Sequence, residues 1–328
     1  MQGIIPADAK GQQIGIGVAQ HLGAGGAARA QIAALSDLPG ASIAGVVAPE
    51  GLPTDLAGMG LAGFEDLESA LARAGADAVS IATPHDTHLA LGLRVLEAGL
   101  PLMVEKPVGL DTGQARTLEA AAQACAGRVG VVLNQRATPA ARWIRDLLQT
   151  GRLRPQAIAF SGHLARATGW HADPRRSGGG LLRLIGIHYV DLLQWWLGSP
   201  QAVSAELEGA PADDRLVVAL RYRSGVLASL QLSAVASRSL GPVRCVIEAA
   251  EARIELAGHR VHRVEGLESP PVESPPAAGE TYGPGHRVAF AEASLALARG
   301  APFPVPLAEA RATLELVDRL TAATLPAR

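Results

Sequence analysis

The first 134 residues alternate short apolar runs with stretches whose apolar residues recur at helical spacing. The apolar runs have the length of buried strands, and the stretches between them have the length of helices. We expect strands over 14–22, 41–48, 77–82, 99–104 and 128–133, and helices over 27–35, 65–74, 88–98 and 112–126. This alternation predicts a parallel sheet with right-handed crossovers.

The pattern changes after residue 134. A strongly apolar helix is expected over 181–197, preceded by a glycine run over 177–180 that is typical of a flexible loop. Five strands then follow without intervening helices, which predicts a largely antiparallel sheet. These strands are expected over 202–207, 215–223, 226–234, 243–249 and 252–256, an extended segment over 155–163, and further helices over 138–150, 286–299 and 307–324.

Composition narrows the class of protein. The chain has 328 residues, of which 48% are apolar, so two domains with substantial cores are expected. A formal net charge of −2 without a basic block argues against nucleic-acid binding. Two widely separated cysteines predict a reducing compartment without disulfides. No apolar run reaches membrane-spanning length and residues 1–13 lack the pattern of a signal peptide, so we expect a cytoplasmic protein.

A glycine-rich turn follows the first expected strand and opens the first expected helix. Gly23, Gly25 and Ala28 have the spacing G-x-G-x-x-A, and Gly26 lies between them. The first glycine allows a tight turn, the second lets the backbone approach a pyrophosphate, and the small residue at Ala28 lets helix and strand pack closely. Phosphate would bind at the helix N-terminus, so the turn predicts a nucleotide site.

These features predict an α/β fold in two domains. Residues 1–134 would form a Rossmann dinucleotide-binding domain, and residues 135–328 an α+β domain with a largely antiparallel open sheet. The last predicted helix, about 307–324, could pack back on the first domain. An acidic residue is expected to end the second strand and bind the ribose, but Ala48 stands there and Glu50 follows two residues later. The sequence leaves the choice between NAD and NADP open. It also leaves open the alternative that cofactor binding is weak or lost.

Two further segments carry candidate chemistry. Glu105, Lys106 and Pro107 end the strand over 99–104, where ligands bind in parallel α/β sheets. They could place a lysine against a substrate, or form a solvated turn. His188 lies within the apolar helix, either as a core histidine satisfied by a carbonyl or by Asp191, or as the proton acceptor for a substrate hydroxyl.

Taken together, these segments resemble the Gfo/Idh/MocA family of oxidoreductases, and the resemblance covers nearly the whole chain. It rests on the glycine turn, on the segments 82–88, 105–107 and 134–136, and on the block 178–191. Residues 282–286 also resemble a segment of members that act on sugars and sugar nucleotides. The resemblance implies a Rossmann domain, an α/β domain whose sheet often forms an oligomer interface, and a nicotinamide in the cleft between domains.

The resemblance also implies the reaction and the roles of single residues. Members transfer a hydride between NAD or NADP and a hydroxyl or ketone of a sugar, sugar nucleotide or cyclitol. Lys106 would bind the reacting oxygen and His188 would exchange its proton, so both are the catalytic candidates. The cofactor candidates are Gly23, Gly25, Gly26, Ala28, Ala48, Thr83, Pro84, His88, Glu105, Lys106 and Pro107. The substrate candidates are Lys106, His188 and Arg176, whose loop could otherwise be simply solvated.

One departure from the family pattern bears on activity. Many members carry aspartate four residues before the histidine, on the same helix face, where this chain has Leu184. Leucine cannot stabilise an imidazolium. An alternative is therefore a catalytically degenerate member that binds a ligand or dinucleotide and regulates a partner, or one that uses the cleft for non-redox chemistry. A small sugar-like substrate and a homodimer or homotetramer are the expected partners, with no nucleic acid, no membrane and no metal.

Overall fold

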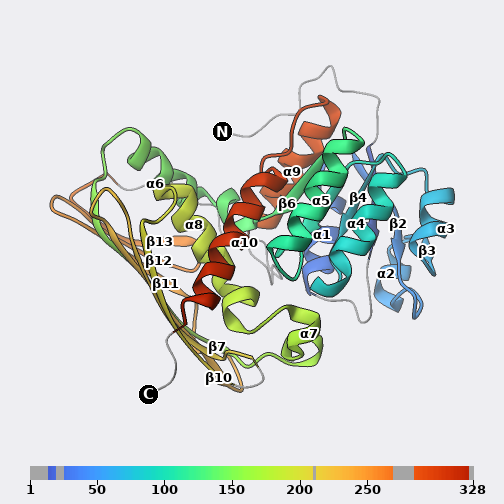
Figure 1. Ribbon diagram of the computed structural model, residues 1–328. Coiled ribbons are helices and arrows are strands. Elements are labelled where there is room, and N and C mark those ends of the chain that lie inside the picture. Colours follow the sequence, from blue (N-terminus) through green and yellow to red (C-terminus); the bar gives the residue numbers. More distant parts are fainter. Residues whose placement is uncertain (1–13, 20–25, 210–211, 269–283, 325–328) are drawn as a thin grey trace. The chain divides into compact units, whose positions relative to one another are not determined.

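A computed structural model describes residues 14–19, 26–209, 212–268 and 284–324 (Figure 1). The chain packs into two compact units. The first contains Met1–Gly109, Gly113–Asn134 and Ala278–Arg311, and the second contains Leu110–Thr112, Gln135–Ala277 and Ala312–Arg328. Each unit therefore includes segments that are far apart in the sequence. Within the described ranges, no helix is long and apolar enough to cross a membrane.

The first unit contains a six-stranded sheet with the order β3-β2-β1-β4-β5-β6, in which every pair is parallel. Its strands are β1 Ile14–Ala19, β2 Ala41–Val47, β3 Gly63–Phe64, β4 Ala78–Ile81, β5 Leu102–Glu105 and β6 Val129–Val132. Its helices are α1 Gly26–Ser36, α2 Thr54–Gly58, α3 Leu67–Arg73, α4 His88–Glu97, α5 Thr112–Ala124 and α9 Pro284–Ala298. The strand order reverses between β1 and β4, which confirms the predicted Rossmann-type sheet and locates its switch point.

Helix α9 completes the core of the first unit although it lies about 150 residues after β6 in sequence. Phe290 is 1% exposed and belongs to one apolar cluster with Ile32 and Leu35 of α1. Val131 of β6 donates its N–H to the carbonyl of Val305, which joins the returning segment to the sheet edge. Residues from the end of the chain therefore stabilise the dinucleotide-type unit.

The second unit contains a seven-stranded sheet with the order β13-β12-β11-β7-β10-β9-β8. Only the β7–β10 pair is parallel, so the prediction of a largely antiparallel sheet is confirmed. Its strands are β7 Pro155–Ala165, β8 Ala202–Glu208, β9 Arg215–Arg221, β10 Leu227–Ala236, β11 Arg244–Ala249, β12 Arg253–Ala257 and β13 Arg260–Glu265. Its helices are α6 Pro139–Gln149, α7 Pro174–Ser177 and α8 Ile187–Leu197; α10 Leu307–Ala322 crosses from the first unit into the second.

One face of this sheet is covered by helices, as Figure 1 shows for α6 and α8, and the other face is open. Burial alternates along β9 and β10, as expected for strands with one covered face. Leu230 on the covered face is fully buried, whereas Val217 and Leu227 on the open face are 45% and 53% exposed. The open face thus carries apolar side chains in contact with solvent.

The helix predicted over 181–197 is interrupted by a wider turn. Residues Leu182–Gly186 form a π-helical turn, and α8 begins only at Ile187. The N–H of Ile187 donates to the carbonyl of Leu182, five residues earlier. Since such a turn takes more than four residues, Arg183 and Leu184 both lie about one turn before His188. The α-helical spacing used to place Leu184 beside His188 thus does not by itself describe the segment before Ile187.

Candidate active site

Three parallel strands of the first unit end at the same edge. The register pairs Ile81 of β4 with Val104 of β5, and Glu105 of β5 with Val132 of β6. The residues that follow these strands, Thr83, Lys106 and Asn134, therefore lie at the carboxyl edge of one sheet. This is the edge at which open α/β sheets bind ligands.

Glu105 is a buried carboxylate at the base of this edge. It is 6% exposed, and its Oε1 accepts a hydrogen bond of 2.9 Å from Nε2 of Gln31. Its Oε2 accepts the backbone N–H of Lys106 at 3.3 Å, and Nε2 of His286 lies 3.4 Å from Oε1. Burial by itself would raise the pKa of Glu105, but the neighbouring His286 and Lys106 outweigh burial and lower it. Glu105 is therefore ionised at neutral pH.

Lys106 stands directly after this carboxylate. Burial lowers the pKa of Lys106, because an ammonium loses hydration there, and the charge of Glu105 opposes that effect. A lysine with a lowered pKa can both donate a hydrogen bond to a reacting oxygen and exchange a proton with it.

His88, the first residue of α4, connects the loops after β4 and β5. It is fully buried, and its Nδ1 and Nε2 lie 2.8 Å and 2.9 Å from the carbonyl oxygens of Pro107 and Thr83. Burial lowers the pKa of His88, against the opposing effect of these two carbonyls. Because both ring nitrogens face backbone oxygens, His88 is placed to hold Thr83 and Pro107 in position. Its predicted part in cofactor binding would be indirect.

The dinucleotide turn is described only in part. Gly23 and Gly25 lie outside the described residues, whereas Gly26 begins α1 and Ala28 is fully buried against the sheet. Ala48 directly follows β2, where the ribose carboxylate was expected. The N–H of Gly51 donates to the carbonyl of Ala48, so Glu50 lies in a tight turn and is exposed. Neither residue supplies a buried carboxylate at this strand end.

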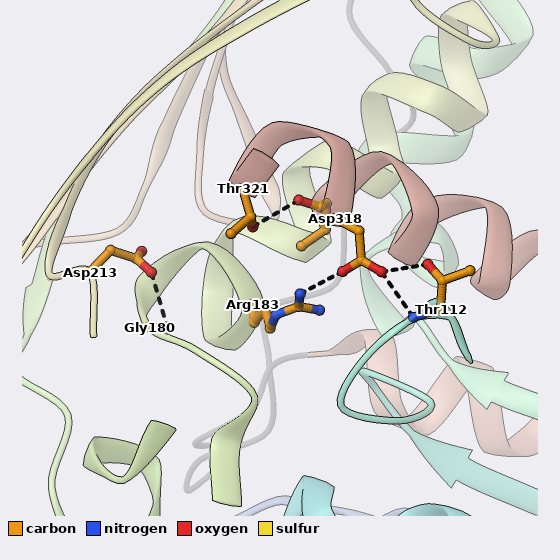
Figure 2. Close-up of polar contacts among 7 residues, drawn as sticks. Thr112, Gly180, Arg183, Asp213, Asp318 and Thr321 are labelled. Atoms are coloured by element: carbon orange, nitrogen blue, oxygen red, sulfur yellow. Dashed lines mark hydrogen bonds and ion pairs between the residues drawn. The ribbon is translucent and has the colours of Figure 1, made fainter. Parts of the chain in front are cut away.

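In the second unit, Asp213 contacts the end of the glycine run that precedes the helical segment of His188, as Figure 2 shows for Gly180. Asp213 accepts the N–H groups of Gly180 at 3.1 Å and Leu182 at 2.8 Å through its carboxylate. Its carbonyl accepts the N–H of Leu181 at 2.8 Å. Burial raises the pKa of Asp213. These three bonds cap the start of the helical segment that carries His188.

A second set of contacts joins the π-helical turn to the last helix, as Figure 2 shows. Arg183 donates through Nη2 to Oδ1 of Asp318 at 2.5 Å. Oδ2 of Asp318 accepts the N–H of Thr112 at 2.9 Å and its hydroxyl at 2.6 Å. Arg183 is only 8% exposed. One carboxylate of α10 thus binds both Thr112 and the turn before His188, all within the second unit.

His188 lies half-buried in the first turn of α8, and Leu184 is 7% exposed in the π-helical turn. Asp191 accepts from Nε and Nη2 of Arg136 at 2.8 Å and 2.7 Å, and from the Thr313 hydroxyl at 2.8 Å. Both carboxylate oxygens therefore accept from Arg136, and Oδ1 also accepts from Thr313.

The substrate candidate Arg176 lies apart from these networks. It is half-buried in the short helix α7, beside Arg175, whose guanidinium pairs with Asp173. Across the part of the chain that the structure describes, no group of three His, Cys, Asp or Glu residues is arranged to hold a metal ion.

Comparison with known proteins identifies the two units. The family model for the oxidoreductase family with an NAD-binding Rossmann fold matches residues 18–132, and the GFO/IDH/MocA C-terminal domain matches residues 142–259. The chain belongs to the Gfo/Idh/MocA oxidoreductase family. Its first unit is accordingly an NAD-binding Rossmann domain, and the resemblance seen in the sequence is confirmed.

Each curated relative is similar to this chain over only part of its length. Mouse trans-1,2-dihydrobenzene-1,2-diol dehydrogenase is 31% identical over 163 residues, which are 47% of each chain. Inositol 2-dehydrogenase of Leifsonia xyli subsp. xyli is 27% identical over 211 residues, or 60% of each chain. The chain spans about half the length of the curated relatives it matches first.

Solved structures share the fold over almost the whole chain. The WlbA dehydrogenase from Bordetella pertussis, solved with NADH and UDP-GlcNAcA, is 22% identical with a TM-score of 0.80, and the match covers 97% of this chain and 99% of that one. A levoglucosan dehydrogenase solved with NADH and levoglucosan has a TM-score of 0.78 at 18% identity, covering 94% and 97% of the two chains.

The Gfo/Idh/MocA Rossmann unit has features that fit a dinucleotide. Helix α1 begins at Gly26 beyond the end of β1, next to the switch point of the sheet, and the small buried Ala28 lets helix and sheet approach closely. An anion at the start of α1 would meet free N–H groups. The residues present therefore fit a dinucleotide phosphate, although no ribose carboxylate follows β2.

Sequence reasoning missed several polar residues around this family site. Gln31 donates a hydrogen bond to Glu105, and Asp213 accepts one from Gly180 of the glycine run. His286 lies beside Glu105. A signal for Gln31 existed, because an uncharged polar residue among the apolar positions of α1 needs a buried partner. Asp213 had no comparable signal, since it acts on a segment far away in the sequence, and His286 was marked only as the end of the segment 282–286 that resembles sugar-active members.

Proposed function

We propose that this protein is an NAD(P)-dependent dehydrogenase or reductase that transfers a hydride between the nicotinamide and a CH–OH or C=O carbon of a sugar, sugar nucleotide or cyclitol. The observation that supports this most directly is Lys106, a lysine of lowered pKa placed after β5 and beside the buried Glu105 carboxylate. The names of the relatives, which include inositol 2-dehydrogenase and 1,5-anhydro-D-fructose reductase, point to the same substrate class.

In the proposed reaction, the nicotinamide supplies the hydride chemistry when it is bound. Lys106 donates a hydrogen bond to the reacting oxygen and stabilises its developing negative charge. His188 exchanges the hydroxyl proton, because imidazole titrates near neutral pH. With leucine at position 184, this histidine acts without the aspartate that many family members place before it.

The remaining site residues are assigned by their positions in the first unit. The glycine turn and the start of α1 would bind the pyrophosphate through Gly23, Gly25, Gly26 and Ala28. The ends of β2, β4 and β5 would contact the rest of the cofactor through Ala48, Thr83, Pro84, Glu105, Lys106 and Pro107, with His88 holding two of these loops. Arg176 in the second unit would bind a polar or anionic group of the substrate.

The test begins with cofactor binding. Calorimetry with NAD, NADH, NADP and NADPH on the full chain should show binding of one pair, and the cofactor's absorbance near 340 nm then follows turnover of a panel of cyclitols, sugars and sugar nucleotides. Lys106→Ala should lose turnover by about 10²–10⁴-fold while retaining cofactor binding. Lys106→Arg is the matched control, since it keeps the charge but not the proton exchange.

Each outcome of this test has a defined meaning. Absence of binding by all four cofactors in folded protein would overturn the hydride-transfer proposal. Binding without turnover of any compound would favour the ligand-binding regulatory alternative. Unchanged turnover in Lys106→Ala would remove the lysine from the mechanism.

We further propose that the protein acts as a homodimer or homotetramer through the open face of its seven-stranded sheet. Val217 and Leu227 expose 45% and 53% of their surface there, which an interface between copies would bury. Light scattering should report a dimer or larger, and Val217→Glu should lower the mass. A monomeric wild-type chain would contradict this proposal.

We also propose a cytoplasmic location, because Cys125 and Cys245 are both free thiols, as expected in a reducing compartment. Fractionation of cells that express the protein should recover it with cytoplasmic markers.

A further inference from the structure

A buried chain of polar side chains surrounds Glu105 within the first unit. The hydroxyl of Ser80 donates to Oε1 of Gln31 at 2.8 Å, and Nε2 of Gln31 donates to Oε1 of Glu105 at 2.9 Å. On the other side, Nδ2 of Asn134 lies 2.9 Å from Nδ1 of His286, whose Nε2 is 3.4 Å from the same Glu105 oxygen. These five side chains are between 0% and 6% exposed.

The outer members of this chain orient the inner ones. Because Ser80 donates to the amide oxygen of Gln31, the amide nitrogen is turned toward Glu105. Because the Asn134 amide nitrogen donates to Nδ1 of His286, a hydrogen of the imidazole lies on Nε2, facing the carboxylate. Oε1 of Glu105 therefore faces two oriented donors, while Oε2 accepts the N–H of Lys106.

The anionic form of Glu105 has a direct consequence for its neighbour. A buried carboxylate favours the charged form of a lysine beside it, whereas burial favours the neutral amine. The pKa of Lys106 thus depends on whether Glu105 stays ionised and in place. Both conditions depend on the donors that hold Oε1.

We propose that Gln31 and His286 are positioning residues that hold the Glu105 carboxylate beside Lys106 and thereby set the charge of that lysine. Gln31 comes from α1, directly after the glycine turn, and His286 comes from α9, near the end of the chain. Gln31 lies outside the segments that carry the family resemblance, and His286 ends the segment 282–286 that resembles sugar-active members. The catalytic meaning of this arrangement rests on the function proposed above for Lys106, but the effect on its charge does not.

A purely structural network would behave differently. If Gln31 and His286 only satisfied a buried carboxylate, their removal would lower stability and leave the protonation of Lys106 unchanged. If they set its charge, the apparent pKa of Lys106 must fall when the carboxylate is neutralised or displaced, because burial then acts without opposition. The protonation of Lys106 is therefore the deciding measurement.

The sequence makes this measurement unusually direct, because the chain contains only two lysines, Lys10 and Lys106. Only an unprotonated amine reacts with acetic anhydride. The rate of acetylation of each lysine, followed by mass spectrometry from about pH 6 to about pH 10, gives its apparent pKa. Lys10 serves as the reference for reagent activity within the same molecule.

Four variants carry the test. Glu105→Gln should lower the Lys106 midpoint by about one to three pH units, since it removes the opposing charge. His286→Leu and Gln31→Met should lower it in the same direction by a smaller amount. His286→Gln, which can still donate from a similar position, should restore most of the wild-type value. If His286→Leu does not fold, Gln31→Met still tests whether loss of a donor to Glu105 lowers the Lys106 midpoint.

The control is Ser294→Ala, which changes another buried polar side chain of α9, 6% exposed, outside this chain of contacts. It should leave the Lys106 midpoint unchanged. The proposal is overturned if the midpoint is the same in the wild type, Glu105→Gln, His286→Leu and Gln31→Met. It is equally overturned if His286→Gln behaves like His286→Leu.

Acetylation needs neither a substrate nor turnover, so failure of the proposed oxidoreductase activity leaves this result interpretable. Where a substrate is found, His286→Leu should move the limb of the kcat pH profile that reports Lys106 toward lower pH by as much as the acetylation midpoint moves. The KM for the cofactor should stay unchanged, because neither Gln31 nor His286 is proposed to contact it. A change confined to the cofactor KM would contradict the positioning role.

Discussion

Substituting Gly180 by alanine tests how the second unit delivers His188. A Cβ at Gly180 would lie 2.5 Å from the backbone nitrogen of Asp213 and closer still to its carbonyl oxygen. Carbon and nitrogen or oxygen atoms without a bond between them normally approach to about 3.5 Å. Because both obstructing atoms belong to the backbone, no side-chain rotation can relieve the clash. The loop of Asp213 and the glycine run must therefore separate.

The cost follows from the contacts that separation disturbs. Asp213 accepts N–H groups from three successive residues, Gly180, Leu181 and Leu182. Each net hydrogen bond is worth about 1 kcal/mol, and overpacking costs about 1–3 kcal/mol. With partial relaxation, we expect Gly180→Ala to lower the free energy of unfolding by about 2–5 kcal/mol. Turnover should fall as well, because the helical segment that begins there carries His188.

Urea unfolding provides the assay, and the positions of the tryptophans make it selective. All four tryptophans lie in the range 135–277 of the second unit, so their fluorescence reports on that unit, whereas circular dichroism follows both units. Gly58→Ala is the control: Gly58 ends helix α2 with no atom within 4 Å of a new Cβ. Alanine there should raise stability by up to about 1 kcal/mol. A fluorescence midpoint for Gly180→Ala equal to that of the wild type would refute the packing argument.

Three other changes have defined outcomes. Arg136→Met should lower the free energy of unfolding by about 3–5 kcal/mol, because it leaves the fully buried Asp191 without its cation; adding Asp191→Asn should recover part of the loss in urea unfolding, and no recovery would contradict the pairing. The folded-state pKa of His88 lies below its ordinary value of 6.5, so the unfolded chain binds more protons. Stability should therefore fall as the pH drops below about 6.5, by at most about 1.4 kcal/mol per pH unit, and His88→Asn should flatten this slope in thermal melts; an identical slope would refute the assignment. Leu184→Asp should raise turnover by up to about 10²-fold if a carboxylate can reach His188, at some cost in stability, whereas Leu184→Asn should not; equal rates for both would show that charge at this position is irrelevant.

The sequence alone predicted the parallel sheet, the largely antiparallel sheet, and the segments that carry Lys106 and His188. These predictions succeeded because they depend on local rules. Buried positions recur every two residues in a strand and every 3.6 residues in a helix, so the elements can be predicted from the apolar pattern. The glycine turn and Glu105–Pro107 directly follow predicted strands, so their place at the strand ends could be predicted as well.

Only the tertiary structure decided how these segments are held. Residues around Phe290 return to the first unit, His286 reaches Glu105, and Asp213 caps the segment before His188, in each case across a long stretch of sequence. The hydrogen bonds between the glycine run and Asp213 could not be predicted because composition reports only the freedom of the isolated chain. The π-helical turn at Leu182–Gly186 could not be predicted because its residues have ordinary helical propensities. Contacts between distant segments depend on which surfaces pack together after folding. The local periodicity of the sequence does not determine which surfaces these are.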